Sequence, residues 1–378
     1  KREIVDNGPA GNIIGVAGLA SFPGETVTLQ KEEPFEEIKH IFEPVITKAI
    51  EAKSPADLPR LIEILRVINK EDPGLRIEIN EETGEHLLSG MGELHLEVIE
   101  NRIKSEKGLD VSTSPPIVVY REAITKTSPQ VEGKSPNKHN KLYFTVEPLS
   151  DELTALIKSG EVPEMRVKKK DVELRDKFIA AGLDSKEAEK VKDIYDGNLF
   201  VDGTRGIVHI GEIMELVLDM FEEVMRKGPI AHEPGFRVKV VLNDAKLHED
   251  AIHRGPSQLY PAVRDGIRDA MMNASPVLFE PVQTLLFECP EEYMGEVSKL
   301  ISNKRGQLLD MKQEGVMVQV KGKMPVAEMF GLSNELRSAT GGRGTSSLID
   351  QTFERLPGEL QQKLVNQIRE RKGLTENQ

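Results

Sequence analysis

The sequence predicts an α+β protein built from several domains. Its 378 residues exceed the roughly 100 to 200 residues that one domain usually contains. Segments with strand-like alternation and segments with helical periodicity follow one another along the chain. One order of elements, βαββαβ, occurs twice, in residues 31–113 and in residues 276–356, and this order is typical of the ferredoxin-like fold. We therefore predict two ferredoxin-like domains with a different, middle domain over residues 114–275 between them.

Residues 1–30 place β-branched residues between glycine-rich turns, as in the stretch GNIIGVAGL. Such a pattern predicts short strands joined by tight turns. We interpret this segment as the C-terminal end of a small β-barrel domain whose earlier strands precede the sequence.

The first βαββαβ unit is defined by its periodicity and its turn residues. Ser54 and Pro55 are a typical cap and first-turn pair, and Gly108 is a typical helix stop. The helix that begins there carries its apolar residues on one face, namely Leu58, Leu61, Ile62, Leu65 and Ile68. The expected elements are a strand at 45–54, this helix, strands at 75–80 and 85–90 joined by the turn 81–84, a helix at 92–108 and a strand at 109–112.

The second βαββαβ unit repeats this order. Its expected strands are 282–290, a hairpin over 307–322 that turns at Glu314 and Gly315, and 346–356. Its expected helices are 326–342 and 291–306, the latter with an apolar face formed by Met294, Val297, Leu300 and Ile301.

Two features mark the end of the chain. Leu360, Leu364 and Ile368 recur every four residues, which predicts a terminal amphipathic helix over residues 357–378. The glycine-rich stretch 339–347 follows a helix and lacks the lysine of a phosphate-binding loop, so we interpret it as a helix stop and a connector.

The middle domain contains an expected strand at 236–247 and an expected helix at 257–275. In the strand, Val238, Val240 and Leu242 alternate with Lys239 and Val241. The inward residues of the helix are Leu259, Val263, Ile267, Ala270 and Met271, and an earlier helix from Gly211 turns inward Ile213, Val217, Phe221 and Val224. The connection between strand and helix reads KLHEDAIHRGPSQLYP, and such a loop presents side chains at the rim of a sheet.

The composition limits the functions open to this chain. With 50 basic and 63 acidic residues, the net charge is −13, which argues against general coating of nucleic acid. The absence of tryptophan and the 4% aromatic content argue against a stacking platform for single strands. A single cysteine, Cys289, excludes an intramolecular disulfide, and there is no long apolar run. We expect a cytoplasmic protein without membrane contact.

His248 and His253 leave three interpretations open. A zinc site is disfavoured because the two histidines are five residues apart on a loop, with no third ligand in view. An acid–base pair of His253 and Asp250 would need a pocket and a substrate that the sequence does not show. A solvated loop histidine is the default for any histidine without partners.

The stretch LHEDAIHRG resembles the loop that carries diphthamide, a modified histidine, in the archaeal and eukaryotic translation elongation factor two family. Four other stretches resemble further parts of this family: PAGNIIGVAGL the end of the second domain, SGMGELHLEVIENRIK the third, SPNKHNKLYF a tip loop of the fourth, and LRSATGGRG the fifth. The resemblance implies that residues 31–113, 114–275 and 276–356 are the third, fourth and fifth domains, the fourth with a fold like ribosomal protein S5 domain 2. Pro256-Ser257-Gln258 resembles the archaeal form.

The resemblance also implies roles for individual residues. His253 is implied to be the histidine modified to diphthamide, and the residues implied to contact tRNA and mRNA are Pro136, Asn137, Lys138, His139, Asn140, Arg254 and Gly255. Of these, Lys138 and Arg254 suit phosphate, whereas Asn137 and Asn140 suit sugar or base edges. The residues implied to shape the loop, or to be recognised by the modifying enzymes, are His248, Asp250 and Ile252. No metal ligand and no catalytic residue is implied.

The function implied by the resemblance is that of the C-terminal part of a factor that catalyses GTP-dependent ribosomal translocation of peptidyl-tRNA and mRNA. Because the chain has no G-x-x-x-x-G-K-[ST] motif, GTP and Mg²⁺ would bind a domain outside it, and this part would not itself be an enzyme. The expected partners are both ribosomal subunits, tRNA, mRNA and the enzymes of diphthamide synthesis, and the protein is expected to be a monomer.

Three points stay open at the level of sequence. The basic run 165–177 is either a solvated helix face or a ribosome contact. The arm could belong to a related GTPase of ribosome maturation or splicing. A stand-alone hydrolase that uses His248, Asp250 and His253 is the third possibility.

Overall fold

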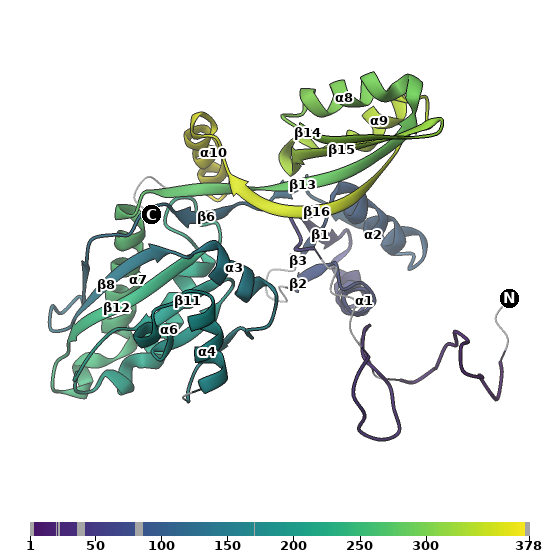
Figure 1. Ribbon diagram of the computed structural model, residues 1–378. Coiled ribbons are helices and arrows are strands. Elements are labelled where there is room, and N and C mark those ends of the chain that lie inside the picture. The colour runs from purple at the N-terminus through teal and green to yellow at the C-terminus, as the bar shows by residue number, and fades with distance from the viewer. Residues whose placement is uncertain are drawn as a thin grey trace. The chain divides into compact units, whose positions relative to one another are not determined.

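The structure is a computed structural model, shown in Figure 1, and it describes residues 4–19, 21, 23–35, 42–79, 86–169 and 171–374. The chain divides into two compact units, Lys1–Ile117 and Val118–Gln378. Both contain helices and sheets, which confirms the predicted α+β class.

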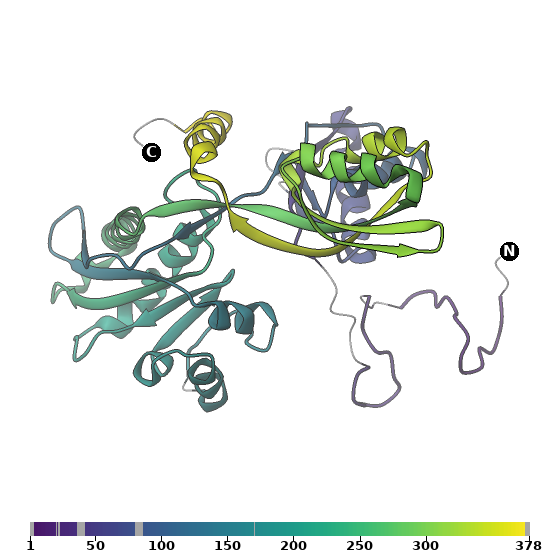
Figure 2. The ribbon, with the colours of Figure 1, turned by 45° about the horizontal axis from the view of Figure 1, so that its top comes forward.

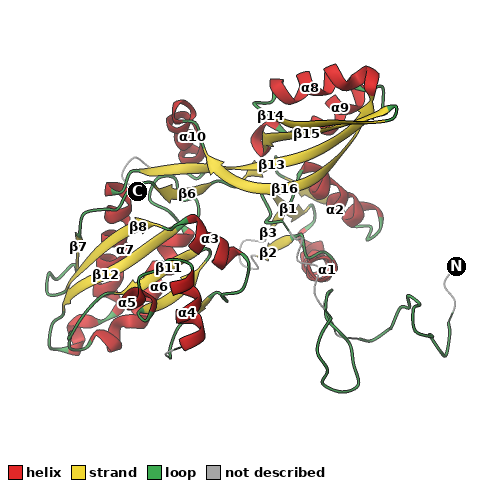
Figure 3. Cartoon of the chain, in the orientation of Figure 1, coloured by secondary structure: helices red, strands yellow, loops and turns green. Residues whose placement is uncertain are grey.

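The first unit begins with a segment that differs from the prediction. The described residues between 4 and 35 form loops and turns without a strand (Figure 3), and Ile13 and Leu29 are fully exposed. A β-strand persists only when a neighbouring strand satisfies its backbone groups. No described strand pairs with this segment, so the expected strands are absent from its described residues. Its assignment to the end of a β-barrel domain stays a prediction.

The remainder of the first unit has the predicted ferredoxin-like order. Its sheet has the strand order β2-β3-β1-β4, and the pairs in this path are antiparallel. The elements are β1 (Ile46–Ala52), α1 (Leu58–Glu71), β2 (Arg76–Ile79), β3 (His86–Gly90), α2 (Glu93–Ser105) and β4 (Val111–Thr113). The predicted turn 81–84 lies outside the described residues. β5 (Ile117–Val118) spans the boundary between the two units.

The helices of this domain bury their apolar faces as predicted. Leu61, Leu65 and Ile68 of α1 are fully buried, and α2 buries Leu96 and Ile99. Each such side chain contributes about 1.5 to 3 kcal/mol relative to an exposed one. The start of α1 differs in detail: Ser54 precedes a short 3-10 turn, and its side chain makes no capping hydrogen bond.

The middle domain is built on a six-stranded sheet with the order β7-β8-β12-β11-β10-β9. Its strands are β7 (Val131–Lys134), β8 (Lys141–Pro148), β9 (Met165–Arg166), β10 (Val191–Tyr195), β11 (Asn198–Asp202) and β12 (Val238–Lys246). Its helices are α3 (Asp151–Lys158), α4 (Val172–Ala180), α5 (Ser185–Ala188), α6 (Ile210–Arg226) and α7 (Pro256–Asn273).

The central strand β12 is covered on both faces. Val238, Val240 and Leu242 pack against α6 and α7, as predicted, but Lys239 and Val241 are also buried. Val241 belongs to a second core formed with α3, α4 and α5. The alternating pattern therefore identified the strand correctly, but the lysine in it predicted an exposed second face. Lys239 can be buried on that face because it forms ion pairs with Glu147 and Glu187 at 3.0 and 2.6 Å.

Two glycines bring the β7–β8 hairpin directly against α7. A Cβ atom on Gly133 would lie 2.0 Å from the carbonyl oxygen of Ala262, and one on Gly266 would lie 3.0 Å from the Cα of Gly133. The backbone of β7 can approach the helix this closely only because neither residue has a side chain. This contact fixes the hairpin relative to the start of α7.

The last domain repeats the ferredoxin-like order with the strand order β14-β15-β13-β16. The elements are β13 (Pro276–Pro290), α8 (Met294–Asn303), β14 (Gln307–Glu314), β15 (Met317–Pro325), α9 (Leu332–Ala339) and β16 (Thr345–Arg355). Helices α8 and α9 cover one face of this sheet (Figure 2). The glycine-rich stretch after α9 is the predicted helix stop, since Gly341 and Gly342 have φ angles of +56° and +79°.

Strand β6 (Arg121–Ile124) ties the middle domain to this last sheet. It pairs with the start of β13, from Pro276 to Phe279, so hydrogen bonds cross the domain boundary predicted at residue 276. Within β6, Glu122 is fully buried, and its carboxylate accepts hydrogen bonds from the backbone N–H groups of Ile230 (2.6 Å), Ala231 (2.8 Å) and Glu233 (2.9 Å). Burial raises the pKa of Glu122 to about 7, although these three bonds oppose the shift.

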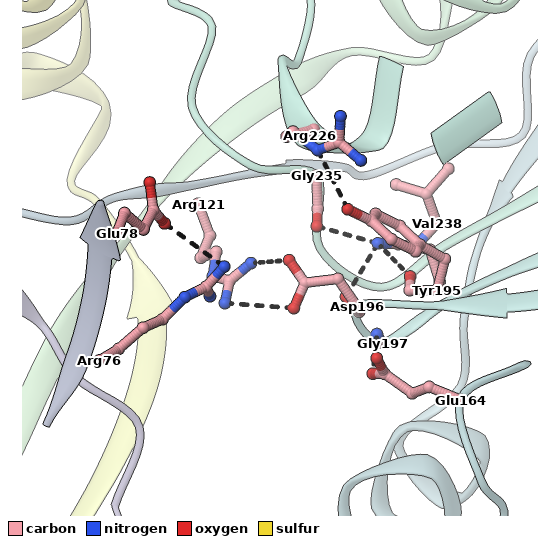
Figure 4. Close-up of polar contacts among 11 residues, drawn as sticks. Arg76, Glu78, Arg121, Glu164, Tyr195, Asp196, Gly197, Arg226, Gly235 and Val238 are labelled. Atoms are coloured by element: carbon pink, nitrogen blue, oxygen red, sulfur yellow. Dashed lines mark hydrogen bonds and ion pairs between the residues drawn. The ribbon is translucent and has the colours of Figure 1, made fainter. Parts of the chain in front are cut away.

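The neighbouring residues complete this connection, which we call the joint (β6 and residues 228–238). Figure 4 shows Arg121 pointing at Asp196, with Nη1 2.6 Å from Oδ2. The buried amide of Asn198 donates to the carbonyl oxygens of Asp196 (2.9 Å) and Gly235 (3.0 Å) and accepts from the N–H of Val238 (2.9 Å).

The predicted terminal helix is α10 (Gly358–Arg371), and it docks on the joint. Lys372, just after it, donates to the carbonyl oxygen of His232 at 2.6 Å and pairs with Glu233 at 2.7 Å. The apolar stripe is shifted from the prediction: Val365 and Ile368 are buried, whereas Leu360 is partly exposed. No helix in the described ranges is long and apolar enough to cross a membrane.

Candidate functional site

Two loops lie together at one end of the middle sheet. Residues 135–140 join β7 to β8, and residues 247–255 join β12 to α7. Strands β8 and β12 are antiparallel neighbours, and their register places Lys141 opposite Lys246. The loops that precede Lys141 and follow Lys246 are therefore adjacent. We call them the tip loops.

Asn140 connects the two tip loops from behind. Its side chain is completely buried, its Nδ2 donates to the carbonyl oxygen of His253 at 2.7 Å, and its Oδ1 accepts from the N–H of His248 at 3.0 Å. The prediction that Asn140 contacts RNA is therefore corrected. Both ends of its amide are occupied by the neighbouring loop, which makes Asn140 a residue that positions His253.

Arg254 is the second correction. Its guanidinium is buried, and it donates to the carbonyl oxygens of His248 and Glu249 and to Oε2 of Glu212 at 2.6 Å. Phosphate cannot reach a guanidinium enclosed in this way. The arginine instead anchors the loop to the first turn of α6.

Two residues of this anchor were not found from the sequence. Glu212 accepts from Arg254 and also meets Nδ1 of His209 at 2.6 Å. The hydrogen bond with His209, followed by that with Arg254, holds the pKa of the Glu212 carboxyl below its ordinary value. Both residues lie more than forty positions before Arg254 in the sequence, and no local pattern links them to the tip.

Asp250 shapes the loop locally. Its side chain caps the 3-10 turn Ala251–Arg254 by accepting from the N–H of Ile252 at 3.1 Å. The N–H of Asp250 itself donates to Nδ1 of His248 at 3.1 Å. Ile252 is 77% exposed, an unusual position for a large apolar side chain that leaves it open to a partner.

Three histidine rings meet where the tip loops touch. The ring centroid of His253 lies 4.5 Å from that of His248 and 5.1 Å from that of His139. His139 and His248 are 5.0 Å apart. Within the described residues, no group of three or more histidine, cysteine or acidic side chains is arranged to hold a metal ion. The arrangement instead fixes the orientation of the half-buried His253 ring between two others.

The other residues that the sequence assigned to the tip differ in exposure. Pro136, Lys138 and His139 are exposed, and Lys138 has a φ angle of +63°, which turns the loop sharply. Asn137 is half-buried, and its Oδ1 accepts from Ser135 Oγ at 2.6 Å and from the N–H of His139 at 3.0 Å. Half-buried Gly255 precedes the first turn of α7. The exposed edge of the tip is therefore narrower than predicted.

Comparisons with known proteins identify the class of protein that has this arrangement. Three models of elongation factor G domains match the chain: domain III at residues 41–115, domain IV at 160–275 and the C-terminus at 277–364. These matches define a multidomain translation elongation factor.

Similar curated proteins narrow this class to one family. The proteins called elongation factor 2 from Thermococcus kodakarensis and Pyrococcus horikoshii are 53% and 52% identical over 98% of this chain, and each match covers 50% of the relative. Elongation factor 2 from Methanosphaera stadtmanae is 53% identical over 99% of the chain and 51% of its own length. The chain belongs to the elongation factor 2 family and spans about half the length of the curated relatives it matches. These relatives do not favour the two alternatives, a related GTPase of ribosome maturation or splicing and a stand-alone hydrolase.

Proposed function

We propose that this chain is the part of an archaeal, GTP-dependent translocation factor that enters the decoding region of the ribosome with its tip loops. The observation that carries the proposal is the exposed edge formed by Lys138 and His139 beside the fixed ring of His253, in a chain of this family. GTP and Mg²⁺ would be bound by a domain outside this chain. The factor would work as a cytoplasmic monomer with both ribosomal subunits, tRNA and mRNA.

The chemistry of the tip supports this role. Lys138 is a flexible cation that can approach a phosphate, while His139 can donate a hydrogen bond to RNA. Diphthamide at His253 would add a fixed positive charge to a side chain whose ring is already oriented by its neighbours. The modifying enzymes would meet a preformed loop, with Ile252 exposed beside the histidine.

Two measurements on the full-length factor test the proposal. The double variant Lys138→Ala/His139→Ala should slow translocation of tRNA by about tenfold, which corresponds to an increase of about 1.4 kcal/mol in the activation free energy. The control Lys126→Ala changes an exposed lysine outside the tip and should leave the rate unchanged. Mass spectrometry of the peptide Leu247–Arg254 from the native organism should show the mass of diphthamide on His253. An unchanged translocation rate would refute the tip contact, and an unmodified His253 would refute the assignment of the modification.

A further inference from the structure

A second concave surface lies at the opposite edge of the middle sheet. Strand β9 is at the end of the sheet opposite to β7, which carries a tip loop. Beside β9 there is a cavity of about 180 Å³, bounded by residues 167–169 and 171, by α4, by the end of α5 and by the start of β10. A shallower hollow continues along residues 165–169 and 171–172. We call this surface the basic cavity.

The floor of the basic cavity is aliphatic. Leu174, Ala188 and Val191 form its buried part, with 4 to 6% of their surface exposed. Val167 and Val172 stand at its sides, and Val172 is 60% exposed. An exposed valine next to a buried aliphatic floor offers an apolar side chain of a partner a place to leave water.

The rim of the basic cavity carries lysines that are free to meet an anion. Lys169 and Lys192 make no ion pair with any other described residue, and Lys168 lies 3.6 Å from Glu215 in a solvent-exposed pair. Arg175 is already neutralised by Asp176 at 2.7 Å and by Glu189 at 3.6 Å. In a chain of net charge −13, this local positive rim is distinctive.

This geometry bears on one of the two interpretations of the basic run 165–177, the solvated helix face, while the ribosome contact stays a prediction. Helix α4 begins only at Val172, so Lys168 and Lys169 precede the helix and cannot form a solvated helix face. Asp171 also lines the cavity, and its carboxylate caps α4 by accepting from the N–H of Leu174 at 3.0 Å. Lys169 therefore stands beside the cavity without an ion pair to any described residue, and Lys168 has only its solvent-exposed pair with Glu215.

We propose that the basic cavity docks an acidic peptide segment of a partner protein, with one apolar side chain of the peptide in the cavity and its carboxylates on Lys168, Lys169 and Lys192. Nucleic acid is the less suitable ligand because bases are held by stacking on aromatic planes, and no aromatic residue lines the cavity. The short edge strand β9 also has an outer side on which no described strand pairs, where an extended peptide can lie.

Fluorescence anisotropy with the 378-residue chain tests this proposal. The probe is a labelled peptide of alternating Asp and Glu with one Leu and one Phe. Controls are the same peptide with Ser at both apolar positions and a labelled oligouridine of equal charge. The acidic apolar peptide should bind saturably, and the Ser peptide should bind about tenfold more weakly.

Variants identify the surface. Lys169→Glu/Lys192→Glu should lower the affinity for the acidic apolar peptide by about tenfold or more. Val172→Asp should lower this affinity to the same extent without altering the fold, because Val172 is exposed. The matched charge reversal Lys126→Glu/Lys227→Glu, at exposed lysines outside the cavity, should leave binding unchanged. The tip variant Lys138→Ala/His139→Ala should also bind normally, so this proposal and the proposed function can fail separately.

Three outcomes would overturn the proposal. Equal binding of the Ser peptide would show that the cavity accepts no apolar side chain. Tighter binding of oligouridine, lost in Lys169→Glu/Lys192→Glu, would make the surface a nucleic-acid contact. Absence of saturable peptide binding would leave the cavity without the proposed partner.

Discussion

The two ends of the middle domain are held by the same device with different chemistry. At the tip, the buried amide of Asn140 makes two hydrogen bonds to the backbone of the neighbouring loop. At the joint, the buried carboxylate of Glu122 accepts three hydrogen bonds from the backbone of residues 230–233. The outer side of the tip is exposed, whereas the joint is covered by the end of α10.

The difference follows from the chemistry of the two side chains. A neutral amide offers both a donor and an acceptor, so Asn140 can hold a loop whose other side is exposed. A buried carboxylate is a stronger acceptor for backbone N–H groups, but it carries a desolvation penalty that only an enclosed, fully bonded site offsets. The tip is therefore an exposed loop surface supported from behind by a buried amide. The joint is a buried contact between two domains.

Removing the carboxylate at the joint should have the largest effect. Glu122→Ala leaves three buried N–H groups without their acceptor, so we expect the free energy of unfolding to fall by about 4 kcal/mol. Urea denaturation of the chain measures this change. Glu161→Ala, at an exposed position of the same unit, is the control and should change little. A loss of less than about 1 kcal/mol in Glu122→Ala would contradict our description of the joint.

Forcing the hairpin away from α7 should have the next largest effect. In Gly133→Ala the new Cβ would overlap the carbonyl oxygen of Ala262, and we expect a loss of about 3 kcal/mol together with a displaced tip loop. Denaturation gives the stability, and protease sensitivity of residues 135–140 reports the displacement. Gly211→Ala is the matched control, since nothing lies within 4 Å of its added Cβ and α6 should gain slightly. Equal behaviour of the two variants would argue against a tight contact.

Asn140 and Asn198 form a matched pair that separates positioning from stability. Both amides are fully buried and bond to loop backbones, Asn140 at the tip and Asn198 at the joint. Each change to Ala should lower the free energy of unfolding by about 2 kcal/mol. The proposed function predicts that, in the full-length factor, only Asn140→Ala should also lower the modified fraction of His253 and slow translocation. If Asn198→Ala lowers both equally, Asn140 has no special positioning role.

The sequence predicted elements better than it predicted contacts. Strands and helices of both ferredoxin-like domains were found because their periodicity is local. The described part of residues 1–30 contains no strand, because strand pairing requires a partner elsewhere. The tip illustrates the same limit. Asn140 and Arg254 are polar residues in loops, which favours an exposed role, but they are enclosed by His253 and Glu212, more than 100 and more than 40 positions away. Sequence distance hides such partners.

The smallest expected effect is a pH dependence of stability that arises from Glu122 at the joint. Burial raises the pKa of Glu122 from 4.5 to about 7, so between these values the unfolded chain releases a proton that the folded chain retains. The free energy of unfolding therefore falls as the pH rises through this window. The stabilisation by Glu122 is fully present below pH 4.5, the pKa of this group in the unfolded chain. The side chain of Glu122→Gln cannot titrate. Between about pH 6 and about pH 7, the free energy of unfolding of the unmutated protein should therefore fall by about 1 kcal/mol relative to that of this variant.

Denaturation of both proteins at each pH measures this difference. Asp193, whose pKa burial also raises to about 7, is present in both proteins and cancels in the comparison. Asn140→Ala should follow the pH dependence of the native protein, because the amide that it removes carries no titratable proton. The free energies of unfolding of Glu122→Gln and of the unmutated protein could instead change in parallel with pH. That result would mean that the three N–H donors keep the carboxylate of Glu122 charged. The joint would then be held by a charged acceptor, whereas the tip is held by a neutral amide.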